Sequence, residues 1–177
     1  KSTTVYMLAK ILEEAGLGVA VSSSLILNIK EKEWINPYHM TMIGRYRMQK
    51  FLYDAKKVGC KYVIVEVTSE GIVQSRHKFI DFDIAVFTNL SEEHLETHGG
   101  FKNYRAEKGK LFNSLMSLEH KNIDGKDIKK GIVVNADDKN ASYFLSFGAE
   151  EKYAFSFKGE CVGIKLEISE CIAPKNF

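Results

Sequence analysis

The stretch Tyr62-Val63-Ile64-Val65, followed at once by Glu66, decides the fold class. Four consecutive apolar residues, most of them β-branched or aromatic, predict a strand that is covered on both faces, as strands of parallel sheets are. Residues 83–87 and 131–134 show the same composition and predict two further strands. Because helical patterns separate these strands, the sequence predicts an α/β fold with a mostly parallel sheet flanked by helices.

The regions around these strands show three other patterns. Residues 22–43 have neither a helical nor an alternating pattern, and we expect them to be irregular. Apolar and polar residues alternate near the C-terminus, which predicts a peripheral β element there, at 152–157 and 162–168. Apolar residues recur at helical spacing in three segments, which are predicted as helices: 2–15, about 46–58 and about 100–118.

Composition limits the class of protein. With 177 residues, 45% hydrophobic and 27% charged, the chain fits a single globular domain over residues 1–177. A net charge of +2, from 25 Lys and Arg against 23 Asp and Glu, gives no reason to expect nucleic-acid binding. The three cysteines have no C-x-x-C spacing, and no apolar run reaches the roughly 18 residues of a membrane span. We therefore expect a cytoplasmic protein that binds neither nucleic acid nor membrane.

Polar residues follow the predicted strands where ligands of parallel sheets bind, beyond the carboxyl ends. Glu66 ends the first strand, and we consider it either a magnesium ligand beside a nucleotide's phosphates or a solvated strand terminus. Asn135-Ala136-Asp137-Asp138 ends the third strand. The side-chain amide of Asn135 either hydrogen-bonds to a nucleotide base or forms an Asx turn that caps the next helix.

Lys1-Ser2 precedes the first predicted helix and has the composition of the second half of a phosphate-binding loop. In such a loop the lysine contacts the terminal phosphates and the hydroxyl contacts magnesium. The alternative is a serine N-cap preceded by an exposed lysine.

His94 and His98 are four residues apart, but Leu95 stands where the H-E-x-x-H zinc motif needs Glu. The missing Glu argues against a metalloprotease and leaves His94 as one ligand of a magnesium site or as a residue that packs or caps. Lys108 lies within the apolar stripe of the predicted helix at 100–118. A lysine there extends to solvent, is paired, or loses its charge. A neutral amine adds carbon dioxide to form an anionic carbamate, which can bind a metal.

Taken in order, these segments resemble the central ATPase domain of the Mur ligases, and within that family the tripeptide-synthetase branch. Residues 1–4 are similar to the end of the family's G-T-x-G-K-[ST]-T loop, and residues 66–76 to its E-V-S-S-H-x-L-x-Q-x-R segment. Residues 88–96 resemble T-N-L-x-x-D-H-L-D, residues 104–112 resemble Y-x-x-A-K-x-x-L-F, and residues 135–138 match N-A-D-D.

The resemblance implies a P-loop NTPase-like fold, the cofactors ATP and Mg²⁺, and an enzyme of peptidoglycan precursor synthesis. Such an enzyme uses ATP to join an amino acid to a UDP-N-acetylmuramyl-peptide through an acyl phosphate. A folylpolyglutamate-synthase-like ligase and a noncatalytic nucleotide-binding homologue are the alternatives. The resemblance also implies that the UDP-binding N-terminal domain and the C-terminal ligase domain lie outside this chain. We therefore expect the chain alone not to catalyse ligation.

The resemblance also implies a role for each candidate residue. The catalytic group is Lys1, His94 and Lys108. The nucleotide-binding group is Lys1, Ser2 and Thr3 at the phosphates, with Asn135 and Asp138 near adenine. The first magnesium is assigned to Ser2 and Glu66, and the second to His94 and carbamylated Lys108. The UDP-muramyl substrate is assigned to Thr41, Ser69, Gln74 and Arg76.

Overall fold

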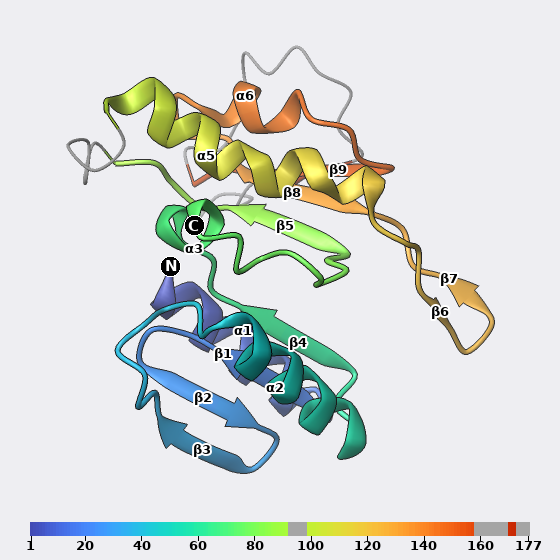
Figure 1. Ribbon diagram of the computed structural model, residues 1–177. Helices are drawn as coiled ribbons and strands as arrows, with labels where there is room; N and C mark the ends of the chain where they lie inside the picture. Colours follow the sequence, from blue (N-terminus) through green and yellow to red (C-terminus); the bar gives the residue numbers. More distant parts are fainter. Residues whose placement is uncertain (92–98, 158–169, 173–177) are drawn as a thin grey trace. The chain divides into compact units, whose positions relative to one another are not determined.

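The computed structural model describes residues 1–91, 99–157 and 170–172, and it divides the chain into two compact units, Lys1–Ile80 and Asp81–Phe177 (Figure 1). Each unit contains a four-stranded sheet with helices packed on it. Among the residues described, no helix has the length and apolar character needed to cross a membrane. The single domain expected over residues 1–177 stays a prediction.

The first unit has a mixed sheet with the strand order β3-β2-β1-β4. The pair β1 and β4 is parallel, whereas β1–β2 and β2–β3 are antiparallel. Its elements are α1 (Ser2–Glu14), β1 (Val19–Ser22), β2 (Ile26–Ile29), β3 (Lys32–Ile35), α2 (Arg45–Lys57), β4 (Tyr62–Val65) and α3 (Ser69–Val73).

Helix α1 covers one face of this sheet because its apolar residues recur at helical spacing. Ala9 is buried against Val19 and Val21 of β1, and the half-buried Val5 and Leu12 complete the cluster. Burial of such side chains contributes about 25 cal/mol for each Å² of apolar surface removed from water. The packing places the first residue of α1, Ser2, near the carboxyl ends of β1 and β4, where ligands of α/β sheets bind.

Two expectations for the first unit were wrong. The segment 22–43 is not irregular throughout, because it contains the β2–β3 hairpin with Ile29 opposite Lys32. Its two-residue turn uses Lys30 at φ 53, a conformation usually signalled by Gly or Asn, so the sequence did not mark it. Strand β4 is also not covered on both faces, since Tyr62 and Val63 are 45% and 38% exposed. It is the last strand in the order of its sheet, which explains the exposure.

The second unit has a parallel sheet with the strand order β10-β9-β8-β5, in agreement with the predicted α/β class. Its elements are β5 (Ile84–Phe87), α5 (Phe101–Ser114), the 3-10 turn η1 (Leu115–Ser117), β6 (Asn122–Ile123), β7 (Lys126–Asp127), β8 (Gly131–Asn135), α6 (Ala141–Leu145), β9 (Glu151–Phe155) and β10 (Glu170–Ile172).

Aromatic rings form the centre of this unit's core. The Phe144 ring of α6 stacks on Phe87 of β5 with 4.0 Å between centroids, and it packs against Phe112 of α5 at 4.8 Å. Such ring pairs add about 0.5–1.5 kcal/mol beyond the area that they bury. Two helices are thereby fixed on the strand that leads to Thr88.

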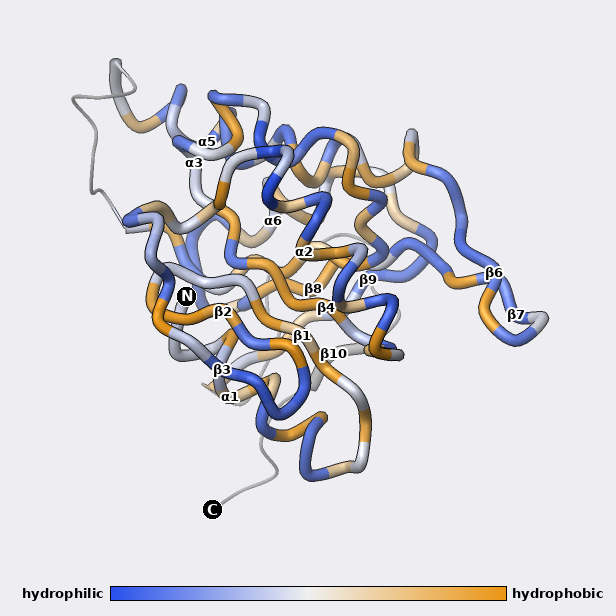
Figure 2. Tube along the Cα trace, turned by 60° about the horizontal axis from the view of Figure 1, so that its bottom comes forward, coloured by the Kyte–Doolittle hydropathy of each residue, from blue (hydrophilic) through white to orange (hydrophobic). Residues whose placement is uncertain are grey.

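Two features of the second unit differ from expectation. Strand β9 is not peripheral, because it pairs with β8 on one side and β10 on the other. Residues 162–168, expected to form a further strand, lie outside the described residues. The segment 122–127 forms a small β6–β7 hairpin, mainly hydrophilic in Figure 2, where no strand was predicted. Its turn is Asp124-Gly125, with both φ angles positive, and this dipeptide is a recognised hairpin signal.

A fully buried lysine lies at the amino end of this sheet. The Lys130 Nζ donates to the Phe82 carbonyl oxygen at 2.9 Å and to Asp83 Oδ1 at 3.2 Å. The other Asp83 oxygen accepts from the partly exposed Lys121 at 2.6 Å. One carboxylate therefore serves a buried and an exposed ammonium group, which satisfies the buried charge.

Candidate functional site

Three polar side chains of the first unit converge where β1 and β4 end and α1 begins. Ser2 Oγ donates to Glu66 Oε2 at 2.9 Å. Ser24, in the loop after β1, contacts the same oxygen through its backbone N–H and its hydroxyl, both at 3.1 Å. The two hydroxyl oxygens of Ser2 and Ser24 lie 2.8 Å apart. Glu66 is only 5% exposed, so these contacts hold a nearly buried carboxylate.

This arrangement fits a hard cation. The bonds described for Glu66 come from neutral hydroxyl and amide groups, and in the described residues no Lys, Arg or His forms an ion pair with it. A buried carboxylate without a cation is costly, and oxygen ligands are those that Mg²⁺ prefers. Over the residues described, no three His, Cys, Asp or Glu side chains gather as a metal cluster. Ser2 and Glu66 are therefore the protein groups here that could hold Mg²⁺, with phosphate and water completing its shell.

The start of α1 also favours an anion. Lys1 is the N-cap of this helix, and the Lys1 carbonyl accepts from the Val5 N–H at 3.0 Å. No side chain caps the helix, and its first turn carries no acidic residue. The N–H groups of the first turn and the helix dipole therefore favour a negatively charged group such as phosphate. Lys1 and Thr3 are both exposed beside them.

The segment that follows Glu66 forms a tight turn into a short helix. The Thr68 hydroxyl accepts from the Gly71 N–H at 3.1 Å and caps α3. Ser69 is buried at the start of α3, and Gln74 at its end is exposed and donates to Glu70 at 3.2 Å.

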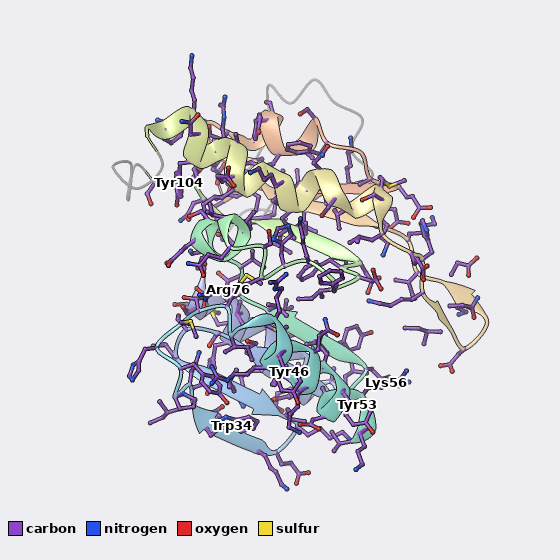
Figure 3. All side chains as sticks on the ribbon, viewed as in Figure 1. Trp34, Tyr46, Tyr53, Lys56, Arg76 and Tyr104 are labelled. Carbon is purple, nitrogen blue, oxygen red and sulfur yellow. The ribbon has the colours of Figure 1, made fainter. Side chains whose placement is uncertain are left out.

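Arg76 connects this segment with the loop that carries Thr41. Its Nη1 donates to the Met42 carbonyl oxygen at 2.6 Å, and the side chain is half-buried. Figure 3 labels Arg76. Met42 is fully buried, and its side chain lies so near Gly71 that an added Cβ would meet the sulfur at 2.6 Å. The structure thus brings Arg76 to the backbone beside Thr41. Within the described residues it gives no hydrogen bond from Thr41 to Ser69 or Gln74.

In the second unit, the N-A-D-D segment ties the ends of β5 and β8 together. Asn135 Nδ2 donates to the Thr88 carbonyl oxygen, and Asn135 Oδ1 accepts from the Asp137 N–H, each at 3.0 Å. Asp138 accepts from the Leu90 N–H at 2.9 Å and from the Asn140 N–H at 2.8 Å. Asn135 therefore forms the expected Asx turn, but this turn does not cap the next helix, because α6 has Asn140 as its N-cap and no side-chain cap hydrogen bond. The position of Asn135 and Asp138 near adenine stays a prediction.

Lys108 lies on α5, whose apolar stripe is as predicted, with Tyr104, Leu111 and Phe112 buried. Lys108 itself is half-buried, and its Nζ lies 5.0 Å from the centre of the Tyr104 ring. A cation over an aromatic face is stabilised by about 0.5–2 kcal/mol. The expected partner, His94, lies outside the described residues, so the second magnesium pair stays a prediction.

A groove of about 670 Å³ in the first unit lies away from these residues. Gly18, Asn28, Lys30 and Gly59 contribute to its lining, at the end of β1 opposite to Glu66. None of the candidate residues lines this groove. The Ser2–Glu66 site lies at the carboxyl edge of the strands.

Sequence reasoning missed Ser24. Its only signal is its place in Ser22-Ser23-Ser24, a run of hydroxyl residues that follows the apolar residues Val19-Ala20-Val21. A run of serines is common in loops, so nothing in the sequence distinguishes Ser24 from its neighbours. The contact to Glu66 spans 42 positions in the chain and becomes visible only in the fold.

Known proteins provide an independent comparison. Residues 1–170 match the model of the Mur ligase middle domain. The chain is 33% identical over 147 residues to a UDP-N-acetylmuramyl-tripeptide synthetase of Roseiflexus sp. (strain RS-1), a match that covers 82% of this chain and 29% of the relative. It is 29% identical over 177 residues to a UDP-N-acetylmuramoyl-L-alanyl-D-glutamate--2,6-diaminopimelate ligase of Caldanaerobacter subterraneus subsp. tengcongensis, covering 100% of this chain and 34% of that one.

A solved structure shows the same relationship. The chain superposes on a UDP-N-acetylmuramoyl-L-alanyl-D-glutamate--2,6-diaminopimelate ligase with a TM-score of 0.70 and 25% sequence identity. The match covers 86% of this chain and 29% of the solved chain, so the chain spans about a third of the length of these relatives. Because the family model matches nearly the whole chain, this protein belongs to the Mur ligase middle domain family.

Proposed function

We propose that this chain is the ATP-binding central part of a ligase that adds an amino acid to a UDP-N-acetylmuramyl-peptide, of the tripeptide-synthetase type. The observation that carries the proposal is the 2.9 Å contact between Ser2 Oγ and Glu66 Oε2 at the start of α1. It joins two oxygen ligands suited to Mg²⁺ with a helix terminus suited to phosphate. The names of the relatives, both UDP-muramyl ligases, support the substrate class.

The reaction divides into two steps. An oxygen of the substrate carboxylate attacks the γ-phosphorus of ATP, the bond to the bridging oxygen breaks, and ADP leaves. The amine of the incoming amino acid then attacks the acyl carbon, releases inorganic phosphate and loses a proton. Both steps move negative charge between oxygens, so positioned positive charge is the main source of rate. Mg²⁺ supplies part of that charge when bound.

The residues of this chain contribute binding and orientation. In the proposed P-loop NTPase-like arrangement, Lys1 would contact the β- and γ-phosphates, with Thr3 beside it, and Ser2 and Glu66 would hold the first magnesium. Lys108, as a carbamate, and His94 would hold the second. The other roles are two groups: Asn135 and Asp138 for the nucleotide, and Thr41, Ser69, Gln74 and Arg76 for the UDP-muramyl substrate.

Phosphate release by the full-length protein tests the proposal. We expect ATP and Mg²⁺ to support turnover when a UDP-muramyl-dipeptide and a suitable amino acid are both present, and not when either is omitted. Folate with glutamate is the control for a folylpolyglutamate-synthase-like enzyme. If ATP binds but no UDP-muramyl-peptide stimulates phosphate release with any amino acid, the proposal is wrong, and a noncatalytic homologue becomes the better description.

A further inference from the structure

Ser24 is the one residue described here whose side chain contacts both proposed ligands of the first cation. Its hydroxyl lies 2.8 Å from Ser2 Oγ and 3.1 Å from Glu66 Oε2, and its N–H donates to that same carboxylate oxygen. Neither the resemblance nor the comparisons assign it a role. We propose that Ser24 is a positioning residue for the cation site, which fixes the Glu66 carboxylate and accepts a hydrogen bond from the Ser2 hydroxyl when a cation binds. The inference rests on the proposed function of Ser2 and Glu66.

The loop that carries Ser24 is held independently of the site. Ser23, its neighbour, is buried, and its hydroxyl donates to the Ile26 carbonyl oxygen at 3.0 Å and accepts from the Ile26 N–H at 3.1 Å. The Ser23 carbonyl oxygen accepts from the Asn36 side chain at 2.7 Å. These bonds fix the turn, so Ser24 is preorganised to hold Glu66 at little entropic cost.

The number of hydroxyl protons explains why Ser24 can accept a hydrogen bond from Ser2 when a cation binds. The oxygens of Ser2, Ser24 and Glu66 make three mutual contacts of 2.8–3.1 Å, but the two hydroxyls have only two protons. In the structure, Glu66 Oε2 accepts a hydrogen bond from each hydroxyl, which leaves a lone pair of Ser24 facing Ser2.

A cation that draws on the lone pairs of Ser2 and Glu66 would compete with the bond from Ser2 to Glu66. The Ser2 proton then needs another acceptor, and Ser24 Oγ is already in place at 2.8 Å. Through its own N–H, Ser24 keeps one bond to the carboxylate in either state. The site can therefore present both oxygens to a cation without leaving a buried donor unpaired.

Binding of Mn²⁺ in the presence of ADP, followed by the electron paramagnetic resonance of the bound ion, tests this role in the full-length protein. We expect Ser24→Ala to weaken Mn²⁺ binding about tenfold, the lower range for loss of a group that orients a metal ligand. Ser24→Thr keeps the hydroxyl and should restore binding to within about threefold of the original protein. Ser23→Ala is the control for loop damage, because it removes a neighbouring hydroxyl that holds the turn but does not contact Glu66. We expect it to weaken Mn²⁺ binding clearly less than Ser24→Ala does.

A double-mutant cycle with Glu66→Gln separates positioning from loop damage. If Ser24 acts through Glu66, Ser24→Ala should have little further effect once the carboxylate is gone. Equal losses in both backgrounds, or equal losses for Ser23→Ala and Ser24→Ala, would overturn the inference. If Ser24→Ala does not fold, Ser24→Cys replaces it, because a thiol is a weak donor.

The outcomes also separate this inference from the proposed function. If the unaltered protein binds Mn²⁺ with ADP and Ser24→Ala binds it equally well, only the role of Ser24 is wrong. If the unaltered protein does not bind Mn²⁺ with ADP at all, the cation site itself is wrong and both proposals fail.

Discussion

The Lys130 ammonium is fully buried and lies 3.2 Å from Asp83 Oδ1. The same carboxylate also binds Lys121, whose side chain is 43% exposed. The two lysines thus share one anion in different surroundings, and the energetic consequences of losing either partner should differ.

Asp83→Asn should destabilise the second unit by about 3 kcal/mol, because it leaves a buried ammonium without a carboxylate. Lys121→Met is the matched control, since it removes only the exposed partner and should cost less than about 1 kcal/mol. Urea unfolding of both variants measures the difference. Equal effects of the two variants would show that burial of Lys130 does not govern the energetics of this pair.

Stability should fall in acid through Glu150 and Glu151. The Lys130 N–H, at 2.7 Å, and His120 lower the pKa of Glu150 below its ordinary value of 4.5. Lys129 and Tyr153 lower the pKa of Glu151 in the same way. A lowered pKa gives stability that is present above the ordinary value and is lost as the pH falls through the folded one.

Unfolding by urea at a series of pH values tests this assignment. We expect the free energy of unfolding to decrease below pH 4.5, and to decrease less steeply in a Glu150→Gln, Glu151→Gln variant. Glu119→Gln, at an exposed position of the same unit, controls for the change in net charge. An acid slope that is the same in the double variant and the original protein would contradict the assignment.

Gly109→Ala should destabilise the protein by about 1–3 kcal/mol, although alanine favours helices. A Cβ at this position of α5 would lie 2.7 Å from the Tyr143 hydroxyl oxygen and 2.9 Å from Phe147. The two rings pack edge to face at 5.3 Å, so neither can move alone. Asn113→Ala, exposed on the same helix, should leave the melting temperature unchanged or slightly higher. An unchanged melting temperature for Gly109→Ala would show that α5 and α6 separate easily.

Lys108→Arg distinguishes a carbamate from a simple cation in the proposed enzyme. Arginine keeps its charge and its stacking on an aromatic ring such as Tyr104, so the melting temperature should change little. A guanidinium does not lose its proton and cannot form a carbamate, so phosphate release should fall at least about a hundredfold. Lys110→Arg, on an exposed lysine paired with Glu107, is the control. Normal turnover of Lys108→Arg would exclude the carbamate.

Regular periodicity made much of the fold predictable. The helices α1, α2 and α5 and the strands β4, β5 and β8 lie within a few residues of their predicted bounds, because each has an unbroken apolar pattern. The β2–β3 hairpin was not predictable in this way, since Lys30 adopts the positive φ of its turn without a Gly or Asn. Strand β9 was found but placed at the periphery. Its polar side chains form hydrogen bonds within the fold; Lys152, for example, donates to the Leu145 carbonyl oxygen at 2.9 Å. The alternation of apolar and polar residues therefore did not mean that this strand lies at the edge of its sheet.

The candidate site was predictable only where a motif carried it. The resemblance assigned Ser2 and Glu66 to one cation, and the structure places their side chains in contact, while their role as ligands stays a prediction. Ser24 and the contact from Arg76 to Met42 depend on loops brought together by the fold. Such contacts join positions far apart in the chain, and no local pattern encodes them.

The double use of the Asn135 amide has one more consequence. Because it binds both the Thr88 carbonyl oxygen and the Asp137 N–H, the exits of β5 and β8 are fixed to each other without help from a ligand. These backbone groups are therefore already ordered, and the binding free energy of a molecule at this edge of the second sheet is not reduced by the cost of ordering them.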